Sequence, residues 1–316
     1  MAAALGILIH VPQWVIVLGV TFCALILQIW GSYTLIRNVL RVLALSLLAY
    51  VASAFLAHPK LAEVVRGTFT PTVHLNREFL AILVAIIGTS LSAYLYTWQS
   101  NEEVEEKIAA GQGTLRERRG TTEAALKTSL WDVIFGMVFS SAIMFFIVLA
   151  TAATLFVAGH HNIESAADAA QSLRPLGGNF AGLLFSLGIV GVGFLAVPVM
   201  TTGAAYDLCQ SAGWRNGLSY KPGEAKIFYA AITVFTLAAM ALNFLGINPM
   251  RALVFAGIVQ GFSTPPLMLL IMVMTNRRSI MGDKVNGRLI NVLGSITTVV
   301  IFAASVCLAI SYLHHS

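Results

Sequence analysis

Residues 79–96 read FLAILVAIIGTSLSAYLY, an apolar stretch that is long enough to cross a lipid bilayer as one helix. Its centre, GTSLS at residues 88–92, places a glycine and three hydroxyl groups at about the middle of the membrane. Irregular backbone at this depth is tolerated only where it lines a cavity or is buried in protein, because unpaired backbone groups are costly in hydrocarbon. Transporters use such interruptions to present oxygen atoms to an ion near the midplane. The stretch therefore predicts a membrane helix that is broken around residues 88–93.

The composition of the whole chain is that of a membrane protein. Hydrophobic residues make up 58% of it and charged residues only 10%, compared with about 25% charged residues in an average soluble domain. We therefore expect an all-α, polytopic helical bundle that forms a single transmembrane domain over residues 1–316 in a lipid bilayer. Eight stretches are long enough to span: 13–32, 40–57, 78–98, 130–158, 179–209, 225–244, 250–274 and 290–312.

Lysine and arginine residues predict the orientation of the bundle, because they are concentrated in cytoplasmic connections. Fourteen of the nineteen lie in four connections, which we assign to the cytoplasm: 33–41, 99–129, 210–226 and 275–289. Within the polar segment 99–129, residues 101–110 have helical character and are expected to continue the broken helix. The net charge of +5 is explained by these connections. It does not indicate nucleic-acid binding, since no basic stripe is interleaved with exposed aromatic residues.

The hydroxyl groups of Thr89, Ser90 and Ser92 allow two interpretations. In a continuous helix, each hydroxyl can donate to the carbonyl of the preceding turn and have no further role. If the helix is unwound here, the hydroxyls and the freed carbonyls form a patch of hard oxygen ligands, which suits Mg²⁺, Ca²⁺ or Mn²⁺.

An acidic run follows the apolar stretch, at Glu102, Glu103, Glu105 and Glu106. On a helix, Glu102 shares a face with Glu105 and Glu106. The run is either a solvated face that pairs with nearby basic residues or an electrostatic funnel that concentrates cations at the cytoplasmic exit.

Gln260 lies deep in an apolar stretch, and Pro265-Pro266 follows it as a second candidate helix break. A lone buried glutamine forms a hydrogen bond across helices or lines an ion path, and the sequence leaves both possibilities open. The chain has no Gly-x-Ser-x-Gly elbow, no His-Glu-x-x-His motif and no Walker loop. It is therefore not expected to be an enzyme, and no resident cofactor is predicted.

Residues 88–100, GTSLSAYLYTWQS, resemble the broken sixth helix of the Nramp (natural resistance-associated macrophage protein) family of divalent metal transporters, which commonly reads G-A-x-x-M-P-H-N-L-x-L-H-S. Gly88 and Ser100 keep their residue types without a gap, and Trp98-Gln99 before an acidic run resembles a bacterial Nramp-related branch. The resemblance continues to the end of the chain, as at Asn248-Pro249 and Gln260-Gly261. It implies a LeuT-type fold of inverted repeats in the bacterial inner membrane. It also implies transport of Mn²⁺ or Fe²⁺, often with protons, and of Mg²⁺ in related branches.

The resemblance also implies roles for individual residues. The family's alanine and methionine ligands correspond to Thr89 and Ser92, and the following histidine corresponds to Tyr94. The glutamine of the family's tenth helix aligns with Gly257, so Gln260 lies one turn further on. The implied metal ligands are Thr89 and Ser92, the implied ion path includes Gly88, Tyr94 and Gln260, and the implied cytoplasmic exit includes Glu102 and Glu106.

Two departures from the family shape the functional hypothesis. The family's ion site also uses an Asp-Pro-Gly-Asn break in its first helix, and no Asp-Pro occurs here. The first span matches the family's fourth helix, so three helices are expected to be missing. Loss of the methionine thioether removes a soft ligand, which favours a hard cation such as Mg²⁺ or Mn²⁺. The alternatives are a transporter of the same fold for an amino acid or other organic substrate, or a transport-incompetent remnant.

Overall fold

The computed structural model describes the chain except for residues 9–10, 32, 46, 71, 74–75, 158, 160–173 and 314–316. The described residues form helices and no strands. Within these residues, seven helical segments are long and apolar enough to cross a membrane, and the expected span 225–244 is a shorter apolar helix, α11 (Lys226–Leu242). The prediction of an all-α, multi-pass membrane bundle is therefore confirmed. The seven segments are Gln13–Trp30, Asn38–Leu56, Arg77–Ala109, Glu123–Phe156, Leu183–Ser211, Pro249–Thr275 and Arg288–Leu313.

The helices divide into two compact units, and the expected single domain stays a prediction. The first unit comprises Met1–Thr70 and Thr97–Met250, and the second comprises Pro71–Tyr96 and Arg251–Ser316. The first unit contains α1 (Ala2–Leu8), α2 (Gln13–Trp30), α3 (Tyr33–Leu45), α4 (Leu48–Leu56), α5 (Leu61–Phe69), most of α7 (Ala93–Ala109), α8 (Glu123–Thr151), the π-helical turn η1 (Ala152–Phe156), α10 (Arg174–Ser211) and α11. The second contains α6 (Arg77–Ser90), most of α12 (Pro249–Thr275), α13 (Arg278–Met281) and α14 (Arg288–Leu313).

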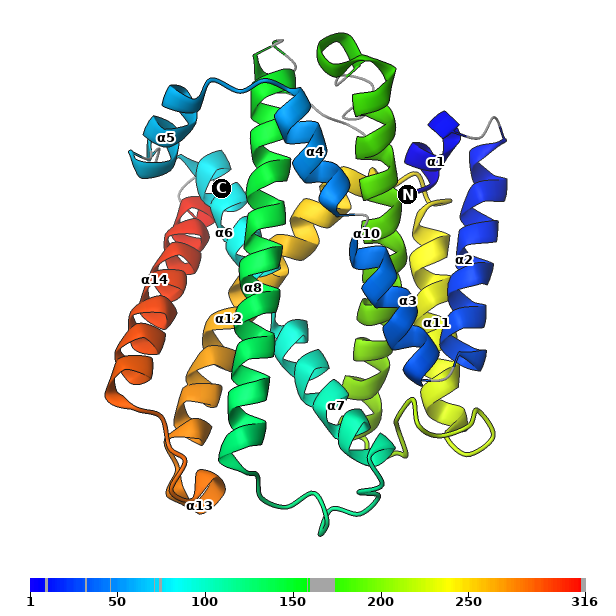
Figure 1. Cartoon of the computed structure of the whole chain (residues 1–316), viewed down its shortest axis with the longest axis vertical. Coiled ribbons are helices and arrows are strands. Elements are labelled where there is room, and N and C mark those ends of the chain that lie inside the picture. The colour runs from blue at the N-terminus through cyan, green and yellow to red at the C-terminus, as the bar shows by residue number, and fades with distance from the viewer. Residues whose placement is uncertain are drawn as a thin grey trace. The chain divides into compact units, whose positions relative to one another are not determined.

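In the first unit, α10 is the central helix and contacts α1, α2, α3, α4 and α11 (Figure 1). One polar cluster lies inside this apolar packing. The buried Gln28 of α2 accepts hydrogen bonds from the hydroxyls of Thr201 (2.8 Å) and Thr202 (3.2 Å) on α10, and its amide donates to the Ala24 carbonyl (3.1 Å). Because these groups are partnered, the cluster joins two membrane helices at low cost.

In the second unit, α6 packs against α12 and α14 around a core that includes Leu80, Val84 and Leu308. The backbones of α6 and α12 approach so closely that only glycine fits between them. A Cβ atom on Gly88 would lie 2.2 Å from the Gly257 carbonyl oxygen and 2.3 Å from the Gly261 nitrogen. Small residues permit this kind of close helix packing in membranes. Gly88 is therefore a packing residue of α6, buried against α12.

The expected second break at Pro265-Pro266 is wrong, because α12 continues through both prolines. A proline inside a helix has no N–H for the carbonyl four residues earlier. For Pro265 that carbonyl belongs to Gly261, and it accepts a hydrogen bond from the Ser305 hydroxyl of α14 (3.3 Å). A neighbouring helix thus supplies the missing donor, which lets the backbone stay helical.

Candidate ion-binding site

The predicted interruption of the third crossing is present, but it is shorter than expected. Helix α6 ends at Ser90 and α7 begins at Ala93, so that only Leu91 and Ser92 lie between them. Leu91 leaves helical geometry, with φ −121° and ψ 38°. Its carbonyl, which would otherwise continue the helix, accepts a hydrogen bond from the Thr264 hydroxyl of α12 (2.9 Å). Gly88, which was expected to belong to the break, is helical.

Ser92 is the residue of the interruption whose environment is most unusual. Its side chain is fully buried, and within the described part of the chain its hydroxyl has no hydrogen-bond partner. A buried polar group without a partner costs about 1–3 kcal/mol. Such a group in a native structure is explained by strain, by a functional role or by a partner that is not protein, such as water or an ion.

The two hydroxyls before the interruption donate to a carbonyl of the preceding turn, as in a continuous helix. Thr89 and Ser90 both donate to the carbonyl of Ile86, at 3.0 and 2.8 Å. Donation uses only the hydroxyl hydrogen and leaves lone pairs on the oxygen. The Thr89 side chain is exposed, whereas Ser92 is buried. The metal-ligand role of Thr89 stays a prediction, and Ser92 is the better placed of the two.

Two further residues of the expected ion path lie in the same unit. Gln260 is half-buried on α12, one turn before Thr264, the residue that binds the Leu91 carbonyl. Within the described residues, the Gln260 side-chain amide has no recorded hydrogen bond, whereas its backbone carbonyl accepts from Ser263 and Thr264. Tyr94 is half-buried in the first turn of α7. The structure thus brings Gln260 close to the interruption, and the roles of both residues stay predictions.

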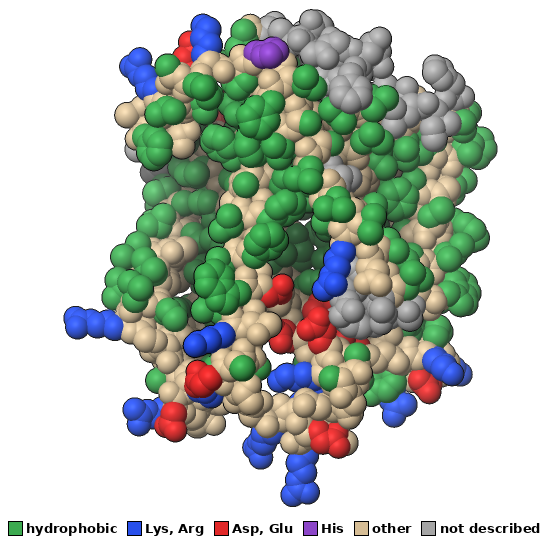
Figure 2. All heavy atoms as spheres, viewed as in Figure 1, with side chains coloured by type: hydrophobic (Ala, Val, Ile, Leu, Met, Phe, Trp, Pro, Cys, Tyr) green, Lys and Arg blue, Asp and Glu red, His purple; other side chains and the backbone are tan. Residues whose placement is uncertain are grey.

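The acidic run lies on α7, where acidic side chains gather in the view of Figure 2. Glu106 is exposed and Glu102 is half-buried, whereas Glu105, which was not selected for the expected exit, is buried. Among the described residues, no group of three or more His, Cys, Asp or Glu side chains could hold a metal ion. The run is therefore no chelating centre, and the cytoplasmic-exit role of Glu102 and Glu106 stays a prediction.

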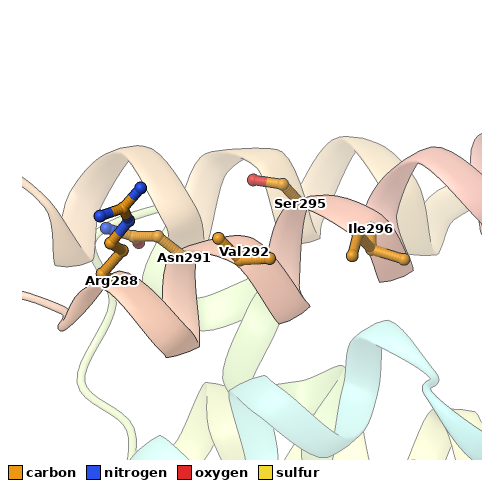
Figure 3. A pocket seen from close by; sticks show the side chains of 5 residues that line it. All are labelled: Arg288, Asn291, Val292, Ser295 and Ile296. Carbon is orange, nitrogen blue, oxygen red and sulfur yellow. The ribbon is translucent and has the colours of Figure 1, made fainter.

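A hollow of about 600 Å³ runs along α14 in the second unit (Figure 3). It contains none of the residues expected on the ion path. Polar and apolar side chains both line it: Arg288, Asn291, Val292, Ser295 and Ile296. All five come from a single helix, and the Asn291 amide already exchanges hydrogen bonds with Asn276 (2.7 and 2.8 Å). The hollow therefore lacks the convergent polar groups from several elements that characterise an ion site.

The described residues form an apolar, multi-pass bundle in which one membrane helix is interrupted around a buried hydroxyl, which is the architecture of an integral membrane protein with a broken helix. The sequence model of the natural resistance-associated macrophage protein-like (Nramp) family matches residues 1–311. The chain belongs to this family, which confirms the expected family and with it the LeuT-type fold.

Individual bacterial proteins show the same relationship. The divalent metal cation transporter MntH of Klebsiella pneumoniae (strain 342) is 23% identical over 290 residues, which cover 92% of this chain and 65% of the relative. MntH of Yersinia enterocolitica is 24% identical over 296 residues, covering 92% of this chain and 66% of the relative. The chain thus spans about two thirds of the length of the relatives that it matches. These relatives are named as transporters and not as enzymes.

Proposed function

We propose that the chain takes part in divalent metal cation transport across the bacterial inner membrane, with the cation held beside the Leu91–Ser92 interruption. The observation that carries the proposal is the buried Ser92 hydroxyl, which has no partner within the described residues and lies where a membrane helix is broken. Membership of the Nramp family and similarity to bacterial divalent metal cation transporters support the same function. Movement of the ion would occur by alternating access around this position.

The chemistry of the interruption favours a hard cation. Hydroxyl and carbonyl oxygens are the ligands that Mg²⁺ and Mn²⁺ prefer, whereas thiolate and thioether sulfur favours softer metals. The resemblance at residues 88–100 implies that Ser92 stands where the family has its methionine ligand. We therefore propose Mg²⁺ or Mn²⁺ as the substrate and expect Cd²⁺ to be a poor one. Rapid flux of Cd²⁺ with little flux of Mg²⁺ would contradict this choice.

The affinity of the chain by itself should be low. Residues 88–93 offer neutral oxygens and no carboxylate, and the affinity of oxygen sites for divalent cations rises with the charge of the ligands. Tight binding of Mn²⁺ by the isolated chain in calorimetry would be evidence against this expectation.

Ion flux into liposomes tests the proposal. Purified full-length chain is reconstituted with an internal Mg²⁺ or Mn²⁺ indicator, and Ser92→Ala is compared with Ser100→Ala. The Ser100 hydroxyl is exposed and donates to its own helix at the Thr97 carbonyl (2.9 Å), so it controls for the loss of a hydroxyl. We expect Ser92→Ala to lower the initial rate at least tenfold and Ser100→Ala to leave it unchanged.

Other outcomes would replace the proposal. Equal rates for wild type and Ser92→Ala would remove Ser92 from the ion path. Competition by amino acids in the same assay, with no response to divalent cations, would favour an organic substrate. A chain that is folded in liposomes but moves neither class of substrate would be the transport-incompetent remnant.

A further inference from the structure

Glu105, on the last turns of α7, is a buried carboxylate with only 2% of its surface exposed. Its Oε1 atom accepts hydrogen bonds from the Tyr206 hydroxyl of α10 (2.7 Å) and from the backbone N–H of Leu218 (2.8 Å). Its Oε2 atom accepts from the backbone N–H of Ser219 (3.0 Å) and from the Ser219 hydroxyl. Leu218 and Ser219 belong to the connection between α10 and α11. One side chain thus joins three parts of the first unit.

The four donors distinguish Glu105 from its neighbours in the acidic run. Two donors on each oxygen use the hydrogen-bonding capacity of an ionised carboxylate, so that no oxygen is left to bind a passing cation. Hydrogen bonds of this kind offset the cost of taking the charge out of water. Removing the carboxylate would take the acceptor from the Ser219 N–H and from two hydroxyls, and it would leave the Leu218 N–H only its longer bond to the Tyr206 oxygen (3.1 Å). These four hydrogen bonds hold α7 to α10 and to the α10–α11 connection, and we call them the fastening; Glu105 is not arranged as an ion ligand.

Two further contacts of α7 with α10 extend the fastening. Asn101 lies one turn before Glu105, and its Oδ1 atom accepts a hydrogen bond from the Gln210 amide of α10 (2.6 Å). Trp98 lies one turn earlier, close enough to α10 that a Cβ atom on Gly203 would be 3.9 Å from its Cε3 atom. The spacing of three and four residues places all three side chains on one face of α7. That face is therefore held along its length.

We propose that Glu105 is a positioning residue for transport, which fastens α7 to α10 and to the α10–α11 connection so that the three move as one body. The proposal rests on the proposed function, because α7 begins directly after the interruption at Ser92. Glu105 lies 13 positions after Ser92, or about 20 Å along a helix. Because α7 is one continuous helix, holding its far end limits how the helix can move, and Ser92 and Tyr94 lie at its other end.

Hydrogen exchange tests the fastening directly, without relying on transport. Glu105→Gln keeps the size of the side chain but replaces one acceptor oxygen by an NH₂ group. Tyr206→Phe removes one donor to Glu105 and also the oxygen that accepts the longer bond from the Leu218 N–H (3.1 Å). The control is Glu106→Gln, an exposed neighbour that carries the same charge. We expect the backbone amides of Leu218 and Ser219 to exchange at least tenfold faster in Glu105→Gln, less so in Tyr206→Phe and at the wild-type rate in Glu106→Gln. Unchanged exchange in both Glu105→Gln and Tyr206→Phe would overturn the proposal.

Flux kinetics on the same proteins test the positioning role. Rates are divided by the folded fraction found by size-exclusion chromatography, so that loss of folded protein does not count. We expect kcat to fall at least fivefold in Glu105→Gln, while KM stays within twofold because the ion ligands are untouched. If Glu105→Gln does not fold, Tyr206→Phe is used to test the positioning role instead. We expect a smaller fall in kcat for this variant.

The two proposals fail in different ways. Faster exchange at Leu218 and Ser219 with an unchanged kcat per folded molecule would make Glu105 a structural residue only and overturn the positioning role. A wild-type chain that moves no cation would overturn the proposed function and the positioning role together, and the exchange experiment would still show whether the fastening exists.

Discussion

A buried polar group lies at each end of α7, and the two groups differ in whether they have hydrogen-bond partners. Ser92, just before the helix, is fully buried and has no hydrogen-bond partner among the described residues, whereas Glu105, near its end, is 2% exposed and has four donors. A fully partnered polar group stabilises one arrangement of the chain, and an unpartnered one costs free energy until something binds it. This difference is the basis of both proposals, a holding role for Glu105 and a binding role for Ser92.

The largest expected effect concerns the packing that holds the other side of the interruption. Gly88→Val would drive side-chain atoms into the α12 backbone, because even a Cβ atom would lie 2.2 Å from the Gly257 oxygen. We expect the free energy of unfolding, measured by SDS titration in detergent, to fall by about 3 kcal/mol. Gly136→Val is the control, since nothing lies within 4 Å of a Cβ atom there. Equal losses at both positions would show that the close approach does not matter.

A smaller effect is expected at the carbonyl that the interruption frees. Thr264→Val keeps the shape of the side chain but removes the donor to the Leu91 carbonyl. Loss of one such hydrogen bond should lower the free energy of unfolding by about 1 kcal/mol. Thr297→Val, which removes only a bond to its own helix at Leu293, is the matched control. If the two variants unfold alike, the Leu91 carbonyl finds another partner.

The comparison is sharpest at Ser92 itself, where removal of the hydroxyl should not lower stability. Ser92→Ala breaks no hydrogen bond within the described part and removes a buried hydroxyl that has no partner there, so we expect the free energy of unfolding to stay the same or to rise by up to about 1 kcal/mol. Ser53, also fully buried, donates to the Ala49 carbonyl (2.8 Å), and Ser53→Ala should cost about 1 kcal/mol. A loss for Ser92→Ala as large as that for Ser53→Ala would show that Ser92 has a structural partner.

The smallest effect concerns an exposed carboxylate in the connection between α7 and α8. The backbone N–H of Thr114 donates to Glu117 Oε2 (2.9 Å), and this bond holds the pKa of Glu117 below its usual value. A lowered pKa stabilises the turn while the carboxylate is ionised, and this contribution is lost as the pH falls through the lowered value. Thr114→Pro removes the N–H and should return the pKa toward its usual value in an NMR titration. Thr114→Ala keeps the N–H and should retain most of the shift.

Hydropathy and charge predicted the membrane helices well, because each span is a property of a continuous stretch of residues. The interruption was also predictable from GTSLS at residues 88–92, but its extent was not. Thr89 and Ser90 donate to the Ile86 carbonyl and remain helical, which is one of the two arrangements that the sequence left open. Pro265-Pro266 was mistaken for a break. Its missing donor comes from Ser305, forty residues further on.

The acidic run shows the limit of local patterns more clearly. Spacing on a helix placed Glu102, Glu105 and Glu106 on one face, but it could not predict which of them is buried and hydrogen-bonded. Glu105 is distinguished by its hydrogen bonds from Tyr206, Leu218 and Ser219, which lie more than one hundred residues away in the sequence. Gln28 was missed as well, although it carries the same signal as Gln260, a lone amide in an apolar span. Its role became visible only when Thr201 and Thr202 were placed beside it.

The contact between Gly88, Gly257 and Gly261 has a consequence for how this protein can vary. No amino acid is smaller than glycine, so every missense change at these three codons adds atoms: into backbone at Gly88 and Gly261, where a Cβ atom would lie 2.2 and 2.5 Å from a carbonyl oxygen, and into a tight contact of 3.2 Å at Gly257. At Gly88 the partners cannot compensate by shrinking, because they are the backbone atoms of Gly257 and Gly261. In a saturation mutagenesis screen, these positions should tolerate almost no replacement. Homologues that retain this helix crossing should therefore retain all three glycines together.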